Sequence, residues 1–314
     1  MYVPTKKMSM PLITIAGFAI ISLTTSLAIP EYANSNEDAS HHMVGGTITN
    51  ITSSPYVVSL QKSRRHFCSG TILTEHIILT AARCVVGMSL SKISIRVGSA
   101  HVGTGGLTYK IDKAVVHGFF RKVSEHNFMN DVALLKLKKP IKFFGVVQPV
   151  TLFNQNETIA GNSSAEAIGW GAVYDGPKNS VELIPDVRDI KEFTVEKIIR
   201  NSYGEIIERK STPWTVVYPQ FLRSLDLKVI EKDKCMETYD GKQLVSLEGQ
   251  ICAISENKET CSNDAGGPLI VDGRQAGIMS WNKGCEATEF PGVYSEVATY
   301  RDWIEHYKNL LPTT

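Results

Sequence analysis

The sequence lacks a charge excess, a long hydrophobic run beyond its first residues and the closely spaced cysteines of a metal site. Its 33 Lys and Arg residues nearly balance its 32 Asp and Glu residues, so the formal net charge is +1. This balance gives no electrostatic reason to expect nucleic acid as the main partner. No later apolar stretch approaches the roughly 20 residues that span a membrane, and we expect no membrane span. No cysteine pair has CxxC spacing, so we expect neither a metal nor another cofactor.

The amino-terminal residues have the organisation of a secretory signal peptide. Two lysines precede a short apolar run from Leu12 to Leu23, and small residues follow it up to Ala28. About a dozen apolar residues are too few for a comfortable membrane span. We therefore predict a signal peptide over residues 1–28, a short pro-segment or flexible arm over residues 29–42, and a secreted, extracellular protein.

The cysteines and the glycosylation sequons are consistent with export. Six cysteines, an even number, indicate three disulfides in an exported chain, although the spacing alone leaves many pairings open. Asn-x-Ser/Thr sequons predict a glycoprotein modified at Asn50, Asn156 and Asn162.

Short apolar runs bounded by Gly, Pro, Asn and Ser dominate the chain from residue 43 onward. Examples are Tyr56 to Leu60, Ile93 to Val97 and Val132 to Leu137. This spacing predicts an all-β sandwich or barrel. One helix is expected at the end, because Thr299 can cap it and apolar residues recur at steps of three and four: Tyr300, Trp303, Ile304 and Tyr307.

The segment from about residue 171 to residue 217 is too long for a structureless loop in a compact barrel. Strand-like pieces flank Asn201-Ser202-Tyr203-Gly204, which favours a β-hairpin. Two interpretations stay open: a tolerated surface insertion, or a loop that binds a partner.

Four motifs follow one another in a specific order: Met43-Val44-Gly45-Gly46, Leu79-Thr80-Ala81-Ala82-Arg83-Cys84, Asn130-Asp131-Val132-Ala133-Leu134-Leu135 and Cys261-Ser262-Asn263-Asp264-Ala265-Gly266-Gly267-Pro268. In this order they resemble the trypsin-like (chymotrypsin-fold, S1-type) serine proteases over nearly all of residues 43–310. The resemblance implies two six-stranded antiparallel β-barrels, a C-terminal α-helix and a cleft between the barrels. It also implies one set of disulfides: Cys68–Cys84, Cys235–Cys252 and Cys261–Cys285.

The catalytic triad of the family is degenerate in this sequence. The resemblance places Asp131 at the aspartate position, Arg83 at the histidine position and Ala265 at the serine position. A guanidinium has no free lone pair to take a proton near neutrality, and a methyl group cannot attack a carbonyl. Asn263 also replaces the glycine of the oxyanion hole. We therefore predict that no residue is catalytic and that the protein is not an enzyme.

Other family sites are partly retained. The resemblance implies that a processed Met43 terminus pairs with Asp264, although no Lys or Arg precedes Met43 as a tryptic activation site. Glu259 stands at the base of the family's specificity pocket and Gly292 keeps a small wall. Asn282 replaces a glycine and narrows the entrance.

Three functions follow as hypotheses. The leading one is a non-catalytic homologue that binds extracellular proteins, such as an active protease or its substrate, as cofactor, decoy or scaffold in an immune or reproductive setting. The second is an unconventional hydrolase that uses Ser262 or Thr260. The third is a glycan- or heparin-binding module, which requires the basic stretches Lys62–His66 and Lys136–Lys142 to converge on one face.

Overall fold

The computed structural model describes residues 46–124, 127–177, 186–200, 206–239, 247–255, 264–283 and 290–311. The chain divides into two units, Met1–Ser40 and His41–Thr314, and every described residue belongs to the second. The predicted signal peptide and pro-segment lie outside the described residues, as do the following site residues: Met43, Glu259, Cys261, Asn263 and Cys285. No helix within the described ranges is long and apolar enough to cross a membrane.

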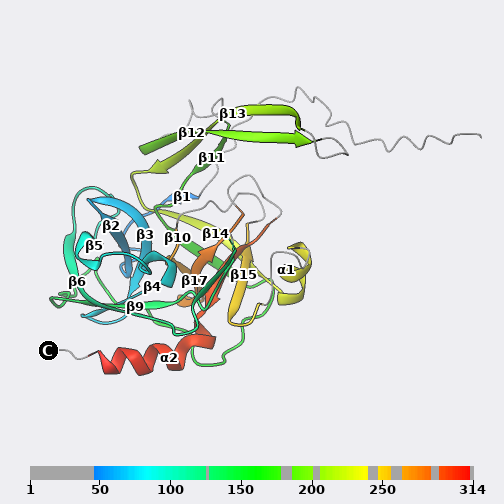
Figure 1. The fold of residues 1–314 in the computed structure, drawn as a ribbon. Helices are drawn as coiled ribbons and strands as arrows, with labels where there is room; N and C mark the ends of the chain where they lie inside the picture. The colour runs from blue at the N-terminus through cyan, green and yellow to red at the C-terminus, as the bar shows by residue number, and fades with distance from the viewer. Residues whose placement is uncertain are drawn as a thin grey trace, which may run out of the picture. The chain divides into compact units, whose positions relative to one another are not determined.

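Six antiparallel strands close the first barrel in the order β2-β3-β4-β9-β6-β5 (Figure 1). The strands are β2 (Val57–Lys62), β3 (Arg65–Ile72), β4 (Ile77–Thr80), β5 (Ile93–Val97), β6 (Leu107–Val116) and β9 (Ala133–Leu137). Side chains alternate along them as the two-residue period of a strand requires. In β5, Ile93, Ile95 and Val97 are buried in the core, whereas Ser94 and Arg96 are partly exposed on the other face.

A second ring of six strands closes because β14 pairs with both β10 and β15. Its strands are β10 (Ser164–Gly169), β14 (Arg223–Ile230), β15 (Gln250–Ile254), β16 (Pro268–Val271), β17 (Arg274–Trp281) and β18 (Gly292–Glu296), and the short β1 (Thr47–Ile48) joins the outer edge of β14. Ile168, Ile270 and Ile278 of this barrel belong to the same buried cluster as the core of the first barrel. The expectation of two six-stranded antiparallel barrels is confirmed.

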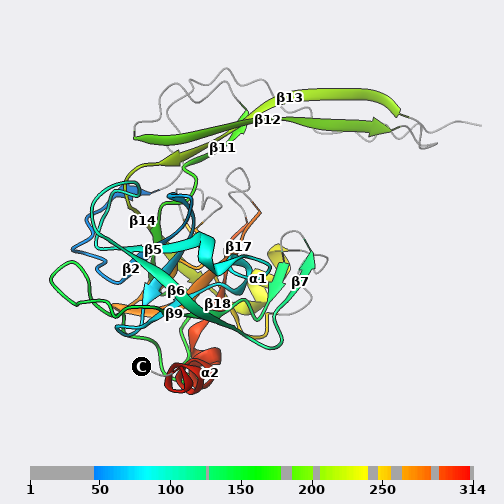
Figure 2. The ribbon, with the colours of Figure 1, turned by 60° about the vertical axis from the view of Figure 1, so that its left-hand side comes forward.

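The C-terminal helix α2 (Val297–Leu310) is present, and Figure 2 views it nearly along its axis. Its buried Tyr300 and Ile304 join the core cluster of the first barrel, while Ala298 joins that of the second. The predicted cap was wrong. The helix begins two residues before Thr299, with Glu296 at the capping position, and the Thr299 hydroxyl lies 3.1 Å from Oε2 of Glu296.

The long segment forms a three-stranded sheet of its own, in the order β11-β13-β12. The expected hairpin is made by β12 (Val187–Arg200) and β13 (Ile206–Pro219), with β11 (Tyr174–Pro177) on the other side of β13. The two long strands extend well beyond residues 193–199 and 205–208, the strand-like pieces predicted from the sequence. Their described pairing partners are each other and β11.

Several smaller elements complete the fold. The strands β7 (Arg121–Ser124) and β8 (Asn127–Met129) form a hairpin, and η1 (Ala82–Cys84) and η2 (Leu90–Lys92) are single 3-10 turns. The short helix α1 (Lys232–Thr238) was not expected, and it carries one half of a disulfide.

Two disulfides have the pairing implied by the family resemblance, Cys68–Cys84 and Cys235–Cys252. Asn50, Asn156 and Asn162 are all exposed, so the three sequons are accessible, and their glycosylation stays a prediction.

Candidate functional site

Asp131 lies just before β9 and is fully buried where the two barrels meet. Its Oδ1 accepts a 2.8 Å hydrogen bond from the backbone N–H of Arg83, and its Oδ2 accepts a 2.7 Å bond from the hydroxyl of Ser280 in β17. The hydroxyl of Ser295 in β18 donates to the Asp131 carbonyl at 3.0 Å. Burial raises the pKa of the Asp131 carboxyl, and the Arg83 charge opposes this shift. Both barrels therefore hold the carboxylate in place.

Arg83 occupies the middle of η1, and its guanidinium is directed to this carboxylate. The Nε atom lies 3.7 Å from Oδ2 of Asp131, as an ion pair, and the guanidinium carbon lies 5.1 Å from the centre of the Phe128 ring. Burial lowers the pKa of the guanidinium, while Asp131 raises it. Because an arginine pKa is normally above about 12, the group stays protonated near neutrality. Asp131 thus faces a permanent cation.

Ala265 lies in the tight turn that leads into β16, and its side chain is buried. Its carbonyl accepts a 2.8 Å hydrogen bond from the N–H of Ser69 and lies 3.6 Å from Sγ of Cys84. The next residue, Gly266, has φ of +83°, and a Cβ there would lie 2.2 Å from the Ser69 carbonyl oxygen. Only glycine fits this position. The turn is therefore anchored on the first barrel, next to the disulfide that follows Arg83.

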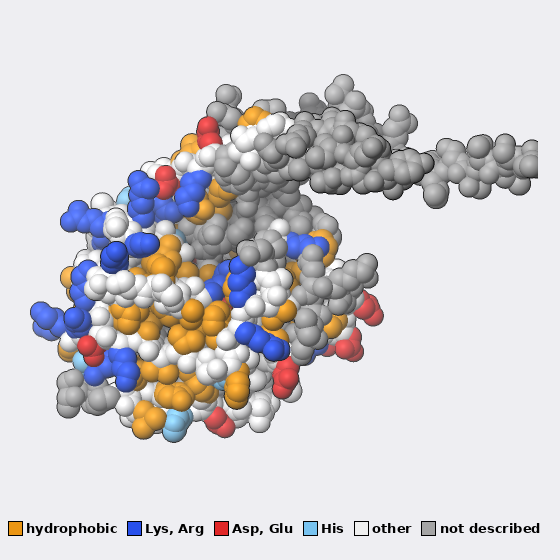
Figure 3. Space-filling model, in the orientation of Figure 1, with side chains coloured by type: hydrophobic (Ala, Val, Ile, Leu, Met, Phe, Trp, Pro, Cys, Tyr) orange, Lys and Arg blue, Asp and Glu red, His pale blue; other side chains and the backbone are white. Residues whose placement is uncertain are grey.

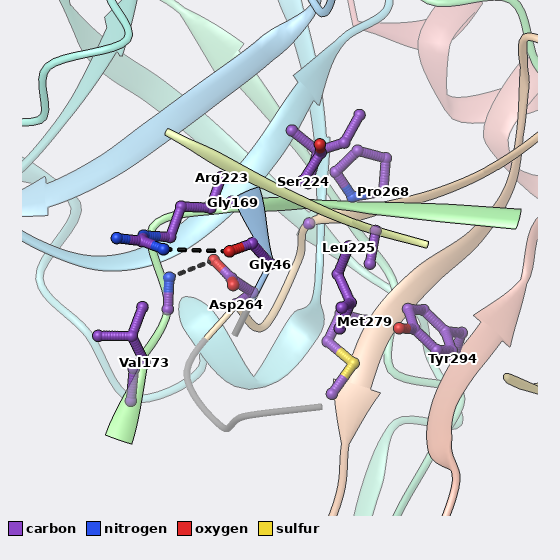
Figure 4. A pocket seen from close by; sticks show the side chains of 15 residues that line it. Gly46, Gly169, Val173, Arg223, Ser224, Leu225, Asp264, Pro268, Met279 and Tyr294 are labelled. Carbon is purple, nitrogen blue, oxygen red and sulfur yellow. Dashed lines mark hydrogen bonds between the residues drawn. The ribbon is translucent and has the colours of Figure 1, made fainter. Parts of the chain in front are cut away.

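Asp264 lies beside a pocket of the second barrel (Figure 4). Its Oδ1 accepts a 2.8 Å hydrogen bond from the N–H of Gly171 and a 3.4 Å bond from the hydroxyl of Ser69. Burial raises the pKa of Asp264 to about 6. A Cβ at Gly169 or at Gly171 would collide with the Asp264 carboxylate, so glycine is required at both positions for the carboxylate to lie here.

Arg223 of β14 also lines the pocket, and sequence reasoning missed it. Its Nη1 donates to the Gly46 carbonyl at 3.1 Å, and its Nη2 lies 3.7 Å from Oδ2 of Asp186 at the base of the hairpin (Figure 4 shows the Gly46 bond). No local pattern marked this arginine, because both partners are distant in sequence.

Ser280 is not among the site residues predicted from the sequence. Its role as a hydrogen-bond donor to Asp131 requires β17 and the residues before β9 to meet, which the sequence does not show.

A second buried polar pair involves His66 of β3. Its Nδ1 lies 2.9 Å from the hydroxyl of Ser59, and its ring lies 5.6 Å from that of Trp170. Burial lowers the pKa of His66 to about 3, so the imidazole is neutral at physiological pH. In the sequence this histidine is marked only as the end of a basic stretch.

The predicted specificity pocket is described in part. Asn282 is buried directly after β17, and Gly292 begins β18, where a Cβ would lie 3.2 Å from the Tyr294 ring. Glu259 falls outside the described ranges. Within those ranges, no three His, Cys, Asp or Glu side chains gather as metal ligands would.

Comparisons with known proteins agree on one family. The family model described as Trypsin matches residues 43–188 and 206–304. Trypsin delta of Drosophila erecta is 29% identical over 262 residues, which cover 83% of this chain and 87% of that protein. Trypsin alpha-4 of Lucilia cuprina is 28% identical over 284 residues, covering 90% and 93% respectively.

Among solved structures, neuropsin, a serine protease expressed in the limbic system of mouse brain, superposes with a TM-score of 0.64 at 24% identity. The match covers 84% of this chain and 98% of that structure. The family model leaves residues 189–205 unmatched, and most of β12 lies in this gap.

Proposed function

The chain belongs to the trypsin-like serine protease family, and from this premise we propose that it is a secreted homologue without peptidase activity that acts by binding other proteins. The observation that supports the proposal most directly is the contact of the Arg83 guanidinium with Asp131. In an active member, this aspartate orients the histidine that removes the proton from the serine.

Arg83 cannot replace that histidine as a base. A protonated guanidinium has five N–H donors and no acceptor, so it cannot remove a proton from a nucleophile or return one to a leaving group. Its pairing with Asp131 also neutralises the carboxylate that would otherwise stabilise an imidazolium. The acid–base half of the mechanism is therefore missing.

The nucleophilic half is missing as well. The Ala265 side chain is a methyl group in a turn whose backbone is still hydrogen-bonded to Ser69. Loss of a triad that works as a unit costs on the order of 10⁶ in turnover. We infer that substrate turnover by this route is negligible.

The rest of the site is still built as a stable scaffold. Both barrels close, Asp131 is hydrogen-bonded from both of them, and α2 joins both cores. A family that acts on proteins presents a protein-binding surface, and an inactive member retains binding without cleavage. Together with the leader-like first residues, this supports a role as cofactor, decoy or scaffold in an extracellular protease cascade or complex, in an immune or reproductive setting.

The catalytic part of the proposal is tested with a fluorophosphonate probe and peptide substrates that carry Lys, Phe or Ala before the scissile bond. We expect no labelling of the purified protein and hydrolysis at the buffer rate, because no nucleophile–base pair is present. An active trypsin under the same conditions is the positive control, and the double variant Arg83→His/Ala265→Ser supplies both missing groups. Labelling of the natural protein that disappears in Ser262→Ala would overturn the proposal in favour of an unconventional hydrolase.

The binding part is tested on the same preparation. The protein is crosslinked in its native extracellular fluid, and the attached proteins are identified by mass spectrometry. Failure to enrich any protein over the heat-unfolded chain contradicts a binding role.

A further inference from the structure

Lys and Arg side chains gather on the part of the surface where β2, β5 and β6 lie, as Figure 3 shows in the orientation of Figure 1. Two hollows lie there, one on each side of the turn between β2 and β3. Ser63 and Arg64 form this turn with φ of 52° and 64°, the left-handed pair of a tight hairpin. The turn projects its basic side chains between the two hollows.

The first hollow has a volume of about 490 Å³ and is lined by four cations, Arg64, Lys92, Arg96 and Lys110. They come from the turn, from η2, from β5 and from β6, so segments distant in sequence supply them. The strand register explains the convergence, because Ser94 is paired with both Gln61 and Lys110 and lies on the same face as Arg96.

The second hollow has a volume of about 370 Å³ and is lined by Lys62, Arg65, Arg188 and Lys191. Its single acidic residue is Asp189. The guanidinium carbon of Arg188 lies 5.2 Å from the centre of the Tyr218 ring, and Nζ of Lys191 lies 4.7 Å from it. The first residues of β12 thus add two cations to those of the β2–β3 turn.

These eight cations have no carboxylate partner at ion-pair distance in the described part of the chain. Some lie close enough to repel one another. Burial and then the charge of Arg64 lower the pKa of Arg96. Burial is also the first cause of the lowered pKa of Arg188, where Asp189, Tyr218 and Asp264 oppose the shift and Arg65 adds to it. Because the net charge of the protein is only +1, this cluster is a local concentration of positive charge, and an anionic ligand would reduce the repulsion within it.

We propose that this surface binds a linear sulfated glycan that crosses the β2–β3 turn and places anionic groups in both hollows. In the first hollow the residues between the cations are mainly hydroxyl and amide side chains, Gln61, Ser91, Ser94 and Thr108, and neither lining contains an aliphatic side chain. The second hollow adds the aromatic rings of Phe67 and Tyr218 to its four cations. A sulfated sugar presents alternating hydroxyl and sulfate groups, and its sulfates suit charge-assisted bonds to Lys and Arg.

The second basic stretch does not contribute. None of the residues from Lys136 to Lys142 lines either hollow, and Lys136 lies 3.8 Å from Asp112. The proposed glycan site therefore consists of the basic stretch Lys62–His66 and the cations that other elements place around it. It does not depend on whether the chain is catalytically active, so the two proposals are tested independently.

The test is binding of the full-length secreted protein to a size-defined heparin oligosaccharide, measured by surface plasmon resonance from about 50 to 300 mM salt, a range over which counterion release is resolved. Lys92→Ala/Lys110→Ala empties the first hollow of two cations, and Lys62→Ala/Lys191→Ala does the same for the second. The matched control is Lys139→Ala/Lys142→Ala, which removes the same charge from exposed positions elsewhere. All variants are checked for native circular dichroism.

We expect each hollow variant to weaken binding at least about fivefold and to lower the slope of log affinity against log salt by about 2, as for loss of two ionic contacts. The control should change affinity less than about twofold. An equal loss of affinity in the control would show that the loss of net charge alone explains the effect, and would contradict the proposed site. Equally tight binding of poly-L-glutamate through the same residues would replace the glycan with an acidic polypeptide, and failure of the natural protein to bind heparin at the lowest salt would remove the proposal.

Discussion

At the scale of single residues, the buried carboxylate of Asp131 determines what position 83 has to supply. Burying a carboxylate without partners costs desolvation free energy. Here a backbone N–H, a serine hydroxyl and a guanidinium together offset that cost. Arg83 therefore gives stability to the site at which the family places an acid–base catalyst.

Replacement of this arginine should destabilise the fold. For Arg83→Ala we expect a loss of about 1 to 3 kcal/mol in the free energy of unfolding, below the maximum for a broken buried pair because the Arg83 side chain is 26% exposed. Urea unfolding followed by fluorescence measures this loss. Arg83→Lys keeps the charge and should recover part of it.

The control for this prediction is a double-mutant cycle with Asp131→Asn. Asparagine needs no counter-cation, so Arg83→Ala should cost less by about 1 kcal/mol or more in that background. Identical losses in both backgrounds would show that Arg83 acts through packing on Phe128 and not through its charge.

Asp264 gives a second prediction at this scale, which depends on pH. Its pKa is raised by burial from 3.8 to about 6, so between about pH 4 and 6 the folded chain keeps a proton that the unfolded chain has released. The contribution of this group to stability therefore falls as pH rises through that window, by about 3 kcal/mol at most, and is constant above it. Asp264→Asn should abolish this fall.

The difference between the natural chain and Asp264→Asn has to be measured, because His66 acts in the opposite sense. Its pKa is lowered to about 3, so it destabilises the fold as pH falls below about 6.5. Thermal unfolding of both chains at several pH values cancels this common contribution. If a processed Met43 ammonium paired with Asp264, the Asp264 pKa would be lowered and the fall in stability with pH would shrink or reverse, so the slope reports whether the terminus is inserted.

At the scale of elements, the sequence predicts best where one local signal suffices. The alternation in β5 and the apolar repeat of α2 are each visible in a single segment. The start of α2 was misplaced because Thr299 is a good capping residue by type, whereas contacts of Val297 and Ala298 with the two cores extend the helix backward. Helix α1 was missed because only two of its seven residues, Cys235 and Met236, are apolar, and they are adjacent, so no helical repeat is visible; a disulfide to β15 holds it.

At the scale of the whole molecule, the motifs predicted the two barrels and the degenerate triad positions, but not the contacts that join them. Ser280 and Ser295 support Asp131 from the second barrel, and Arg223 connects Gly46 with the base of the hairpin. Each contact joins segments far apart in sequence, and nothing in a local pattern encodes them. The convergence of basic residues around the β2–β3 turn is of the same kind.

The hairpin offers a test of whether the barrels form an independent scaffold. Phe193 of β12 is paired with Trp214 of β13, so an Asn-Gly turn that joins these two residues removes the outer hairpin and keeps its base. The described partners of the removed strand residues are each other, and shortening the connection lowers the entropy cost of closing it. We expect the thermal midpoint to change by less than about 4 °C, as measured by calorimetry.

The base of the hairpin should behave differently from its outer part. Asp186 lies 3.7 Å from Arg223, which in turn donates to Gly46 beside the Asp264 pocket. Asp186→Ala, which leaves the outer hairpin intact, should therefore lower the midpoint more than the complete shortening does. If the shortened chain were the less stable of the two, the outer hairpin would have to pack on the barrels. The hairpin would then be part of the scaffold, and a partner that binds the hairpin would also change the stability of the site around Asp131.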